Sequence, residues 1–308
     1  RRLFEALQDY ECTNLFASPA LIDKLGRYCT DQDLELTSLQ RAISAGAPAS
    51  SPALERFQGC LPEGVDVLTC YGATESLPVA MLGSREILRE TRQLTDRGGG
   101  VCVGRPSTGI HVRIVPIHDE PIESWLEDLA LPPGETGEIV VRGAVVTPSY
   151  YKRPQATKLA KIPAEGGEVW HRMGDIGYFD EQGRLWMCGR KSHRVDAETG
   201  TLYTVACEAV FNMHPAVRRS ALVGVVREGV TTPLICVERV KQTTIKNGRL
   251  TKELLEIARS HDHTRTIDTV LYHPSFPVDV RHNAKIFREK LAEWASKKLA
   301  SRQASAHP

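Results

Sequence analysis

Two oppositely charged side chains lie near the ends of a predicted β-hairpin in residues 170–191. Asp175 follows Gly174, where the backbone can bend sharply, and Arg190 follows the second predicted strand. Residues 180–183 have the composition of the turn between the strands. A carboxylate suits the hydroxyls of a sugar diol, and a planar guanidinium suits a phosphate. The hairpin therefore predicts a site for a phosphorylated sugar, and the alternative is a surface hairpin with incidental charges.

The composition is that of an ordinary globular protein. Hydrophobic residues make up 41% and charged residues 25% of the 308 residues, a length that suits about two domains. The formal net charge is +1, which gives no argument for a nucleic-acid partner. No apolar run approaches the roughly 20 residues of a membrane span. Eight cysteines without a C-x-x-C pair favour reduced thiols, so we expect a cytoplasmic protein. We expect no nucleic-acid partner and no membrane span.

The first part of the chain alternates short apolar strands with helices. We expect strands at residues 14–17, 41–44 and 65–70, and helices at residues 19–28 and 51–57. This order predicts a parallel α/β unit. Ligands of such sheets bind beyond the carboxyl ends of the strands. Two segments lie there, Gly46-Ala47-Pro48 and Tyr71-Gly72-Ala73-Thr74-Glu75.

From residue 101 the pattern changes to short strands separated by Gly and Pro. Residues 112–115, 137–141 and the hairpin predict a small antiparallel sheet or barrel packed on the α/β part. A boundary is expected within residues 189–192, followed by a smaller α+β unit in which Lys285 precedes the last helix. The predicted domains are therefore residues 1–190 and 191–308.

Six motifs recur in the order typical of the adenylate-forming (AMP-binding, acyl-CoA synthetase-like) superfamily, which the chain resembles between residues 40 and 290. They are Tyr71-Gly72-Ala73-Thr74-Glu75, Gly137-Glu138-Ile139-Val140-Val141-Arg142-Gly143, Tyr150-Tyr151-Lys152-Arg153-Pro154, Gly174-Asp175, Gly189-Arg190 and Asn283-Ala284-Lys285-Ile286-Phe287-Arg288. The resemblance implies an α/β fold: the C-terminal part of a large adenylation domain, with a parallel α/β layer and a small β-barrel-like sheet, followed by a small α+β domain.

The resemblance implies ATP and Mg²⁺ as cofactors and gives the site residues their roles. Tyr71 would offer a flat face to adenine, Asp175 would accept hydrogen bonds from both ribose hydroxyls, and Arg190 would bind ribose or phosphate. The alternatives are a core aromatic side chain, a turn carboxylate and an exposed linker arginine. The implied nucleotide-binding set is Gly46, Ala47, Pro48, Tyr71, Gly72, Ala73, Thr74, Asp175 and Arg190.

Three residues are implied to act on the phosphates and the reacting carboxylate. Thr74 would donate its hydroxyl to the α-phosphate, and Glu75 would hold Mg²⁺. Lys285, in a mobile small domain, would bring positive charge to the carboxylate and the α-phosphate as the catalytic lysine. The alternatives are a helix-terminus charge for Glu75 and a solvated side chain for Lys285. The implied hinge between the domains is Arg190, Lys191 and Ser192.

A closer resemblance is to the β-lactone synthetase family of bacterial long-chain olefin biosynthesis. It is carried by residues 71–80, 170–175, 188–195 and 276–286. Met173 and Ala284 stand where the superfamily commonly has threonine and glycine, and Ser192 stands where the hinge residue is usually Asp or Lys. The resemblance implies that a long-chain 2-alkyl-3-hydroxy fatty acid is activated as acyl-adenylate. Its own 3-hydroxyl would close a β-lactone, releasing AMP, in a complex with other olefin-pathway enzymes.

Two other functions remain open from the sequence. The first is a long-chain fatty acyl-CoA or acyl-AMP ligase of the same fold. The second is a non-catalytic, truncated subunit that binds a nucleotide or joins an assembly. A requirement for CoA would separate the first from lactone formation, and an in-frame phosphate loop upstream of Arg1 would exclude the second.

The superfamily's Ser/Thr/Gly-rich phosphate loop, which ends in Pro-Lys-Gly, does not occur in these 308 residues. The nearest glycine cluster, Gly98-Gly99-Gly100, lacks its hydroxyls and its lysine. The chain also opens at Arg1 in a helical pattern, so we expect it to be the C-terminal half of the enzyme. We therefore predict little or no ATP–pyrophosphate exchange by the 308-residue chain alone, and substantial exchange would contradict this expectation.

Overall fold

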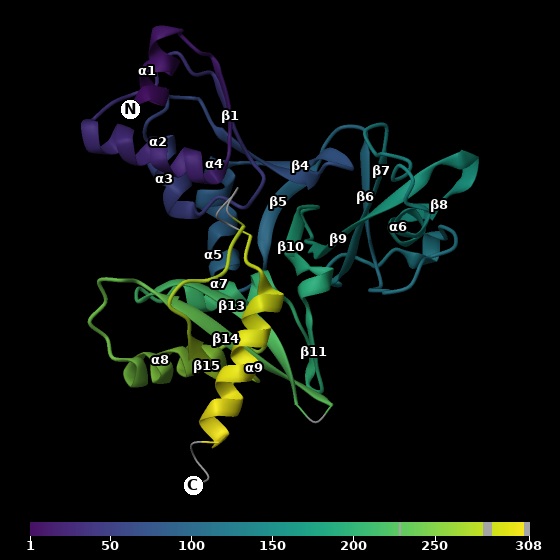
Figure 1. Cartoon of the computed structure of the whole chain (residues 1–308). Coiled ribbons are helices and arrows are strands. Elements are labelled where there is room, and N and C mark those ends of the chain that lie inside the picture. Colours follow the sequence, from purple (N-terminus) through teal and green to yellow (C-terminus); the bar gives the residue numbers. More distant parts are fainter. Residues whose placement is uncertain (228, 280–284, 305–308) are drawn as a thin grey trace. The chain divides into compact units, whose positions relative to one another are not determined.

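The computed structural model describes residues 1–227, 229–279 and 285–304. The chain divides into two compact units (Figure 1). Unit 1 comprises Arg1–Gln93 and Val101–Met187, and unit 2 comprises Leu94–Gly100 and Cys188–Pro308. The assignment of residues 1–190 and 191–308 as the two domains of an enzyme stays a prediction.

Unit 1 begins with three parallel strands that helices cover on one face. Ser18 starts the second helix, because its Oγ accepts a hydrogen bond from the backbone N–H of Leu21 at 3.4 Å and Pro19 fills the first turn. Buried side chains of the helices, among them Ile22 and Phe57, form one apolar core with the strands. This part contains β1 (Asn14–Ala17), β2 (Arg41–Ala45), β3 (Val67–Ala73), α1 (Arg2–Asp9), α2 (Pro19–Gln32) and α3 (Ser51–Gln58).

The same sheet continues through antiparallel strands. β4 (Ser76–Gly83) pairs with β3, and β5 (Val101–Pro106) pairs with both β4 and β10 (Leu185–Arg190). The hydrogen-bonded order is β1-β2-β3-β4-β5-β10-β9-β7-β6, and β8 pairs with β9 beside this path. The remaining elements are β6 (Ile110–Val115), β7 (Gly137–Gly143), β8 (Lys161–Pro163), β9 (Val169–Phe179), α4 (Ser84–Glu86), a π-helix (Ile87–Thr91), α5 (Arg92–Asp96), α6 (Pro154–Ala160) and 3-10 helices at Glu127–Leu129 and Glu165–Gly167.

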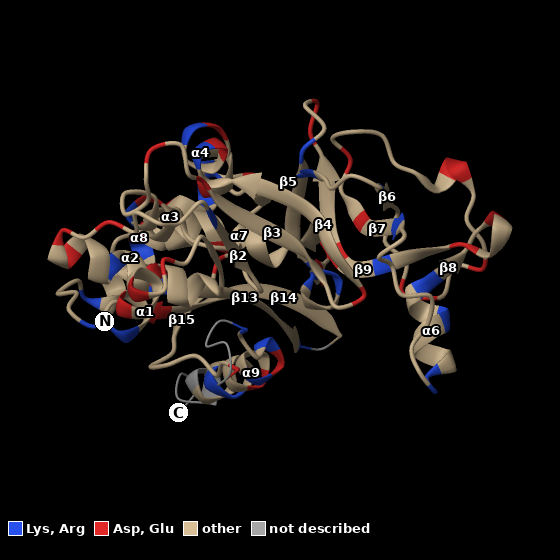
Figure 2. Ribbon diagram, turned by 90° about the horizontal axis from the view of Figure 1, so that it is seen from above, with Lys and Arg blue, Asp and Glu red and all other residues tan. Residues whose placement is uncertain are grey.

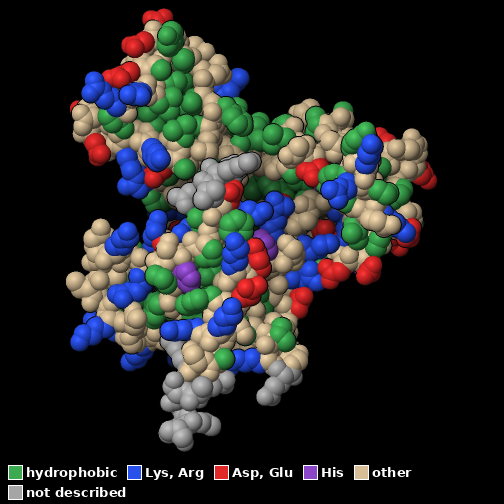
Figure 3. All heavy atoms as spheres, in the orientation of Figure 1, with side chains coloured by type: hydrophobic (Ala, Val, Ile, Leu, Met, Phe, Trp, Pro, Cys, Tyr) green, Lys and Arg blue, Asp and Glu red, His purple; other side chains and the backbone are tan. Residues whose placement is uncertain are grey.

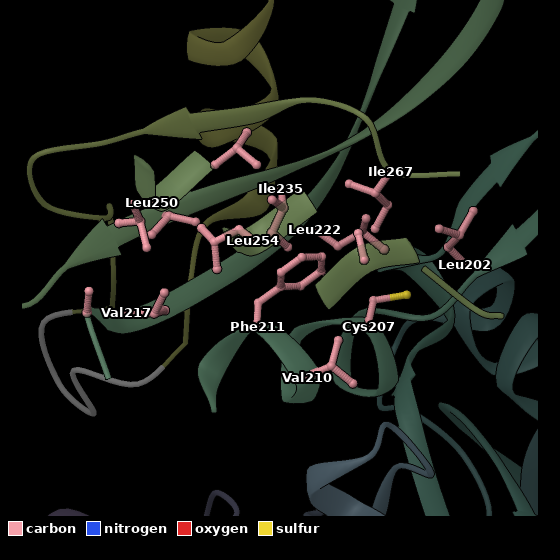
Figure 4. Packing of buried hydrophobic residues seen from close by; sticks show 14 of the residues in the cluster. Leu202, Cys207, Val210, Phe211, Val217, Leu222, Ile235, Leu250, Leu254 and Ile267 are labelled. Atoms are coloured by element: carbon pink, nitrogen blue, oxygen red, sulfur yellow. The ribbon is translucent and has the colours of Figure 1, made fainter. Parts of the chain in front are cut away.

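Unit 2 contains a small sheet with helices on both faces. β13 (Val217–Arg227) runs antiparallel to β14 (Val230–Arg239), and β15 (Val270–Tyr272) runs parallel to β14. On one face, Phe211 and Leu250 pack in a cluster with Leu222 and Ile235 (Figure 4). On the other face, Leu291 belongs to a second cluster. The other elements are a 3-10 helix (Lys191–His193), β11 (Val195–Ala197), β12 (Gly200–Leu202), α7 (Thr204–Asn212), α8 (Asn247–Arg259) and α9 (Arg288–Ala304).

The mixed α/β fold expected from the sequence is confirmed, with a large sheet followed by a small α+β unit. β3 differs from its prediction at both ends: it begins at Val67 and not at residue 65, and it continues past residue 70 to Ala73, with β4 turning back beside it. Gly72 permits this tight return, because a Cβ there would lie 2.6 Å from Ser76 O. The antiparallel strands are also continuous with the parallel ones, since β5 joins β4 to β10.

The second face of the parallel strands carries partly exposed apolar side chains. Phe16, Ile43 and Leu68 are register partners across β1, β2 and β3, so they lie on the same side of the sheet. Phe16 is 67% exposed. Apolar side chains gather over β1 in the space-filling view (Figure 3). Parallel sheets in α/β proteins are generally covered on both faces, so this face is unusual in its exposure.

The cysteines are all free thiols, and apart from the half-buried Cys12 and Cys70 they are buried. Within the described ranges, no helix combines the length and apolarity that crossing a membrane requires. The cytoplasmic location stays a prediction.

Candidate active site

A β-bulge in β9 contains Gly174 and Asp175. The register between β7 and β9 shifts between Glu138 and Val140, with the extra residues in β9. Gly174 lies in this stretch with a φ of 67°, which glycine adopts without steric cost. Asp175, the next residue, is 3% exposed. The sharp bend predicted at Gly174 is therefore present, and it occurs inside a strand.

Asp175 meets Tyr71 at the end of β3. The Tyr71 hydroxyl donates a hydrogen bond to Asp175 Oδ2 at 2.7 Å. Ala45, the last residue of β2, pairs with Cys70 in parallel register, so Gly46 directly follows β2 and Tyr71 is the next residue of β3. Gly46 is exposed and has a φ of 96°, with open space where a Cβ would stand. The structure thus brings Gly46, Tyr71 and Asp175 to one edge of the sheet, and the exposed Pro48 and half-buried Ala47 follow Gly46 there.

A buried ion pair anchors β9 three residues before Asp175. Arg172 Nη2 lies 2.6 Å from Glu138 Oε2, and the two side chains are 2% and 1% exposed. The same guanidinium donates to the carbonyl oxygens of Glu120 at 2.8 Å and Leu159 at 3.1 Å. Such a pair is tolerated in the interior when further hydrogen bonds satisfy its charged groups. Arg172 therefore fixes β9 beside the bulge.

Thr74 and Glu75 form the two-residue turn between β3 and β4, since Ala73 pairs with Ser76. Thr74 is exposed and Glu75 is half-buried. The hydroxyl of Tyr150 donates a hydrogen bond to Glu75 Oε1 at 2.6 Å. This bond is the largest cause that lowers the pKa of Glu75 below its ordinary value, so the carboxylate is ionised at neutral pH.

Two titratable residues near Glu75 received no role from the sequence, Lys161 and His171. Lys161 is 4% exposed, and burial lowers the pKa of its ammonium group to about 8. Burial, and next the charge of Lys161, lower the pKa of His171 to about 4, so its imidazole is neutral at pH 7. No local pattern could have identified Lys161, because lysines are rarely buried.

In unit 2, Lys285 lies exposed just before α9. Its carbonyl oxygen accepts a hydrogen bond from the backbone N–H of Asp279 at 2.9 Å, and Val278 pairs with Ile286 in an antiparallel bridge. These contacts hold the backbone of Lys285 while its side chain reaches solvent. The predicted motif residues Asn283 and Ala284, together with Arg281 and His282, lie outside the described residues.

A second buried ion pair follows Lys285 by three residues. Arg288 donates hydrogen bonds from both terminal nitrogens to Glu208 of α7, with 2.9 Å between Nη2 and Oε2. Arg288 also donates to the carbonyl oxygen of Leu222 at 3.3 Å. The side chains of Arg288 and Glu208 are 15% and 10% exposed. The pair ties the start of α9 to α7 and β13.

The predicted hinge occupies the end of β10 and the short helix after it. Arg190 is the last residue of β10 and is exposed, while Lys191 and Ser192 lie in the 3-10 helix. The pKa of His193 is lowered to about 4 by its burial and then by nearby positive charges. These charges belong to Arg288, Arg190 and Lys285. Within unit 2, the two predicted cationic site residues therefore lie near one imidazole.

The glycine cluster at residues 98–100 has a packing role. Gly98 belongs to unit 2 and has a φ of 88°. A Cβ at Gly98 would lie 2.1 Å from His263 Nε2. Close packing against the histidine ring therefore requires glycine here.

The donor set for a metal ion is sparse. In the part of the chain that the structure describes, no three His, Cys, Asp or Glu side chains form a metal-binding group. Mg²⁺ in nucleotide enzymes is commonly held by one or two carboxylates together with substrate phosphates. The ionised Glu75 at an exposed turn fits that mode of binding.

Known proteins resemble the chain in sequence and in fold. The AMP-binding enzyme family matches residues 1–151. An olefin beta-lactone synthetase of Stenotrophomonas maltophilia (strain K279a) is 45% identical over 309 residues, covering 98% of this chain and 54% of the relative. An amide bond synthetase from Marinactinospora thermotolerans aligns with a TM-score of 0.74 and 25% identity, over 95% of this chain and 55% of that one.

A further solved structure contains a nucleotide. The O-succinylbenzoate coenzyme A synthetase of Bacillus subtilis, in complex with ATP and magnesium ion, aligns with a TM-score of 0.71 and 21% identity, over 94% of this chain and 53% of that one. The chain thus spans about half the length of the curated relatives and solved structures that it matches. The roles of the individual site residues stay predictions.

Replacing Lys161 with methionine should remove a pH dependence of stability. The pKa of Lys161 is lowered from 10.5 to about 8 in the folded protein, so between these values the unfolded chain binds more protons and stability rises with pH. We expect Lys161 to raise the free energy of unfolding by on the order of 2 kcal/mol across this pH range, and this rise should be lost in Lys161→Met. Urea unfolding at pH 7 to 10 measures the free energy of unfolding of both proteins.

The exposed Lys158 of α6 provides the control for this experiment. Lys158→Met should keep the rise in unfolding free energy with pH. An equal slope in the unsubstituted protein and in Lys161→Met would show that Lys161 does not contribute it.

Proposed function

We propose that this chain, a member of the adenylate-forming AMP-binding enzyme family, is the part of a β-lactone synthetase that holds the nucleoside and Mg²⁺. Its membership, expected from the six motifs, is confirmed by the family match and by 45% identity to an olefin beta-lactone synthetase. The observation that carries the proposal is the meeting of Tyr71 and Asp175 beside the ends of β2 and β3.

The adenosine moiety would lie at this edge of the sheet. The ring of Tyr71 would stack on adenine, which Gly46 lets approach closely because no side chain stands there. The carboxylate of Asp175 would accept hydrogen bonds from the ribose hydroxyls. Its bond from Tyr71 keeps the carboxylate in place before the nucleotide arrives, which reduces the reorganisation needed on binding.

The phosphates would extend toward the turn at Thr74 and Glu75. Thr74, exposed at the tip, would donate its hydroxyl to the α-phosphate. Glu75 would hold Mg²⁺, which supplies charge neutralisation at the phosphates when it is bound. Lys285 would contribute a second positive charge, stabilising the negative charge that develops during transfer.

The reaction would proceed in two steps. A substrate carboxylate oxygen attacks the α-phosphorus of ATP, and the bond to pyrophosphate breaks. The 3-hydroxyl oxygen of the same substrate then attacks the activated carbonyl carbon, loses its proton, and displaces AMP as the β-lactone closes. The attack is intramolecular and has the proximity advantage of such reactions. A long-chain 2-alkyl-3-hydroxy fatty acid is the proposed substrate.

A second candidate is an acyl-CoA ligase that uses the same nucleotide site. A 2-succinylbenzoate--CoA ligase of Bacillus mycoides (strain KBAB4), 32% identical over 62% of this chain, favours it, whereas the higher sequence identity is to a lactone-forming relative. In both candidates the first step is adenylation, so the two differ only in the nucleophile that attacks the acyl-adenylate.

The nucleoside part of the proposal can be tested on the chain itself. Asp175→Asn should weaken AMP binding about tenfold or more, since a hydrogen bond to a charged group contributes roughly 1.5–3 kcal/mol. It should also reduce the preference for AMP over 2′-deoxy-AMP. Calorimetric titration with both nucleotides measures the two effects, and Glu181→Gln, at an exposed position of the same hairpin, is the matched control. Unchanged AMP binding by Asp175→Asn would refute the ribose role.

The reaction can be tested in a protein that carries this chain at the full length of its relatives. ATP and a long-chain 2-alkyl-3-hydroxy acid, incubated without CoA, should yield AMP and a β-lactone. Mass spectrometry detects the lactone directly. A product that forms only when CoA is added would establish the ligase instead.

A further inference from the structure

The segment after β7 holds the turn that carries Thr74 and Glu75 by hydrogen bonds. The backbone N–H of Thr147 donates to Glu75 O at 2.9 Å. The hydroxyl of Tyr150 donates to Glu75 Oε1 at 2.6 Å. The same short segment therefore holds both the main chain and the carboxylate of Glu75, from a position about 75 residues away in the sequence.

This segment is itself anchored at several points. Lys161 Nζ donates to Thr147 Oγ1 at 3.3 Å, and the backbone N–H of Tyr150 donates to Thr157 Oγ1 at 3.0 Å. The partners Lys161 and Thr157 come from β8 and α6, which carry basic side chains (Figure 2). The backbone of Tyr150 is thus fixed, so its hydroxyl lies at a defined position beside the Glu75 carboxylate.

The charges around Glu75 favour an ionised carboxylate. Lys161 lies close enough to lower the pKa of Glu75 and is buried at 4% exposure. The ammonium group also lies 5.8 Å from the ring centroid of Tyr150. A hydrogen-bond donor on one oxygen and a nearby cation hold the group in its charged form.

We propose that Tyr150 is a positioning residue that holds one oxygen of Glu75 and thereby aims the other at the Mg²⁺ of the bound nucleotide. This rests on the proposed role of Glu75 as the Mg²⁺ ligand. Carboxylates that ligate metals are themselves hydrogen-bonded, and loss of such a partner typically weakens metal binding by about 10- to 100-fold. The Tyr150 hydroxyl has the donor chemistry and the distance for this task.

The experiment uses three single variants and one double variant of the chain, with Mg²⁺ and ATP as the probe. Calorimetry measures the affinity for ATP in the presence of Mg²⁺ and in the presence of EDTA. The ratio of these two affinities is the enhancement of ATP binding by Mg²⁺. Tyr150→Phe keeps the ring and removes the hydroxyl, and we expect the enhancement to fall on the order of tenfold. Tyr151→Phe is the matched control, because the neighbouring Tyr151 is 85% exposed, and it should leave the ratio unchanged.

A metal-free measurement separates positioning from a structural effect. AMP binding reports the adenosine site at Tyr71 and Asp175, and Tyr150→Phe should leave it unchanged. Loss of AMP affinity equal to the loss of Mg²⁺ enhancement would show a general structural effect and overturn the inference. In the double variant, Tyr150→Phe should add little to the effect of Glu75→Gln, because both act through one carboxylate.

Failure of the inference and failure of the proposed function give different results. In one outcome, Glu75→Gln abolishes the enhancement of ATP binding by Mg²⁺ while Tyr150→Phe leaves it unchanged. That result would support Glu75 as the Mg²⁺ ligand and refute the positioning role of Tyr150. If Glu75→Gln matches the unsubstituted protein, or if Mg²⁺ does not enhance ATP binding in that protein, the metal role of Glu75 fails, and this inference fails with it.

Discussion

A carboxylate as buried as that of Asp175 needs a donor at a fixed distance, and Tyr71 supplies one at 2.7 Å. The position of each of these two residues depends on a neighbouring glycine. Tyr71 depends on Gly72, whose missing Cβ lets β4 return closely, and Asp175 depends on the positive φ of Gly174. One hydrogen bond thus joins a hairpin and a bulge from distant parts of unit 1, and the geometry of the proposed nucleoside site follows from it.

Each unit holds its proposed functional residue beside a buried ion pair. In unit 1, Arg172 pairs with Glu138 three residues before Asp175. In unit 2, Arg288 pairs with Glu208 three residues after Lys285. Both arginines also donate to backbone carbonyls, so their planar guanidinium groups bind several segments at once. Each pair fixes the chain three residues from the proposed functional residue, which suits a residue that must meet a ligand in a fixed direction.

The sequence predicted those parts of the site that local patterns encode. The order of strands and helices placed Gly46 just beyond β2, and Gly174 signalled the bend before Asp175. Tyr71 was expected beyond β3 but lies inside it. The return strand β4 was missed because Pro78 interrupts its apolar pattern. The contact of Tyr150 with Glu75 was also beyond prediction, since it depends on a pairing across about 75 residues that tertiary packing alone determines.

The surroundings of Glu75 indicate that its turn does more than connect β3 and β4. A two-residue hairpin turn is normally solvated and needs no partner from elsewhere in the chain. Here a lysine whose pKa is lowered to about 8 by burial lies near the turn, and keeping such a cation buried opposes folding at neutral pH. Structural ion pairs can also shift pKa values, but a strongly shifted group beside an oriented carboxylate is more typical of a functional site. The buried Lys161 and the oriented carboxylate are consistent with the proposed role of Glu75, in which a charged carboxylate is held in place for a cation.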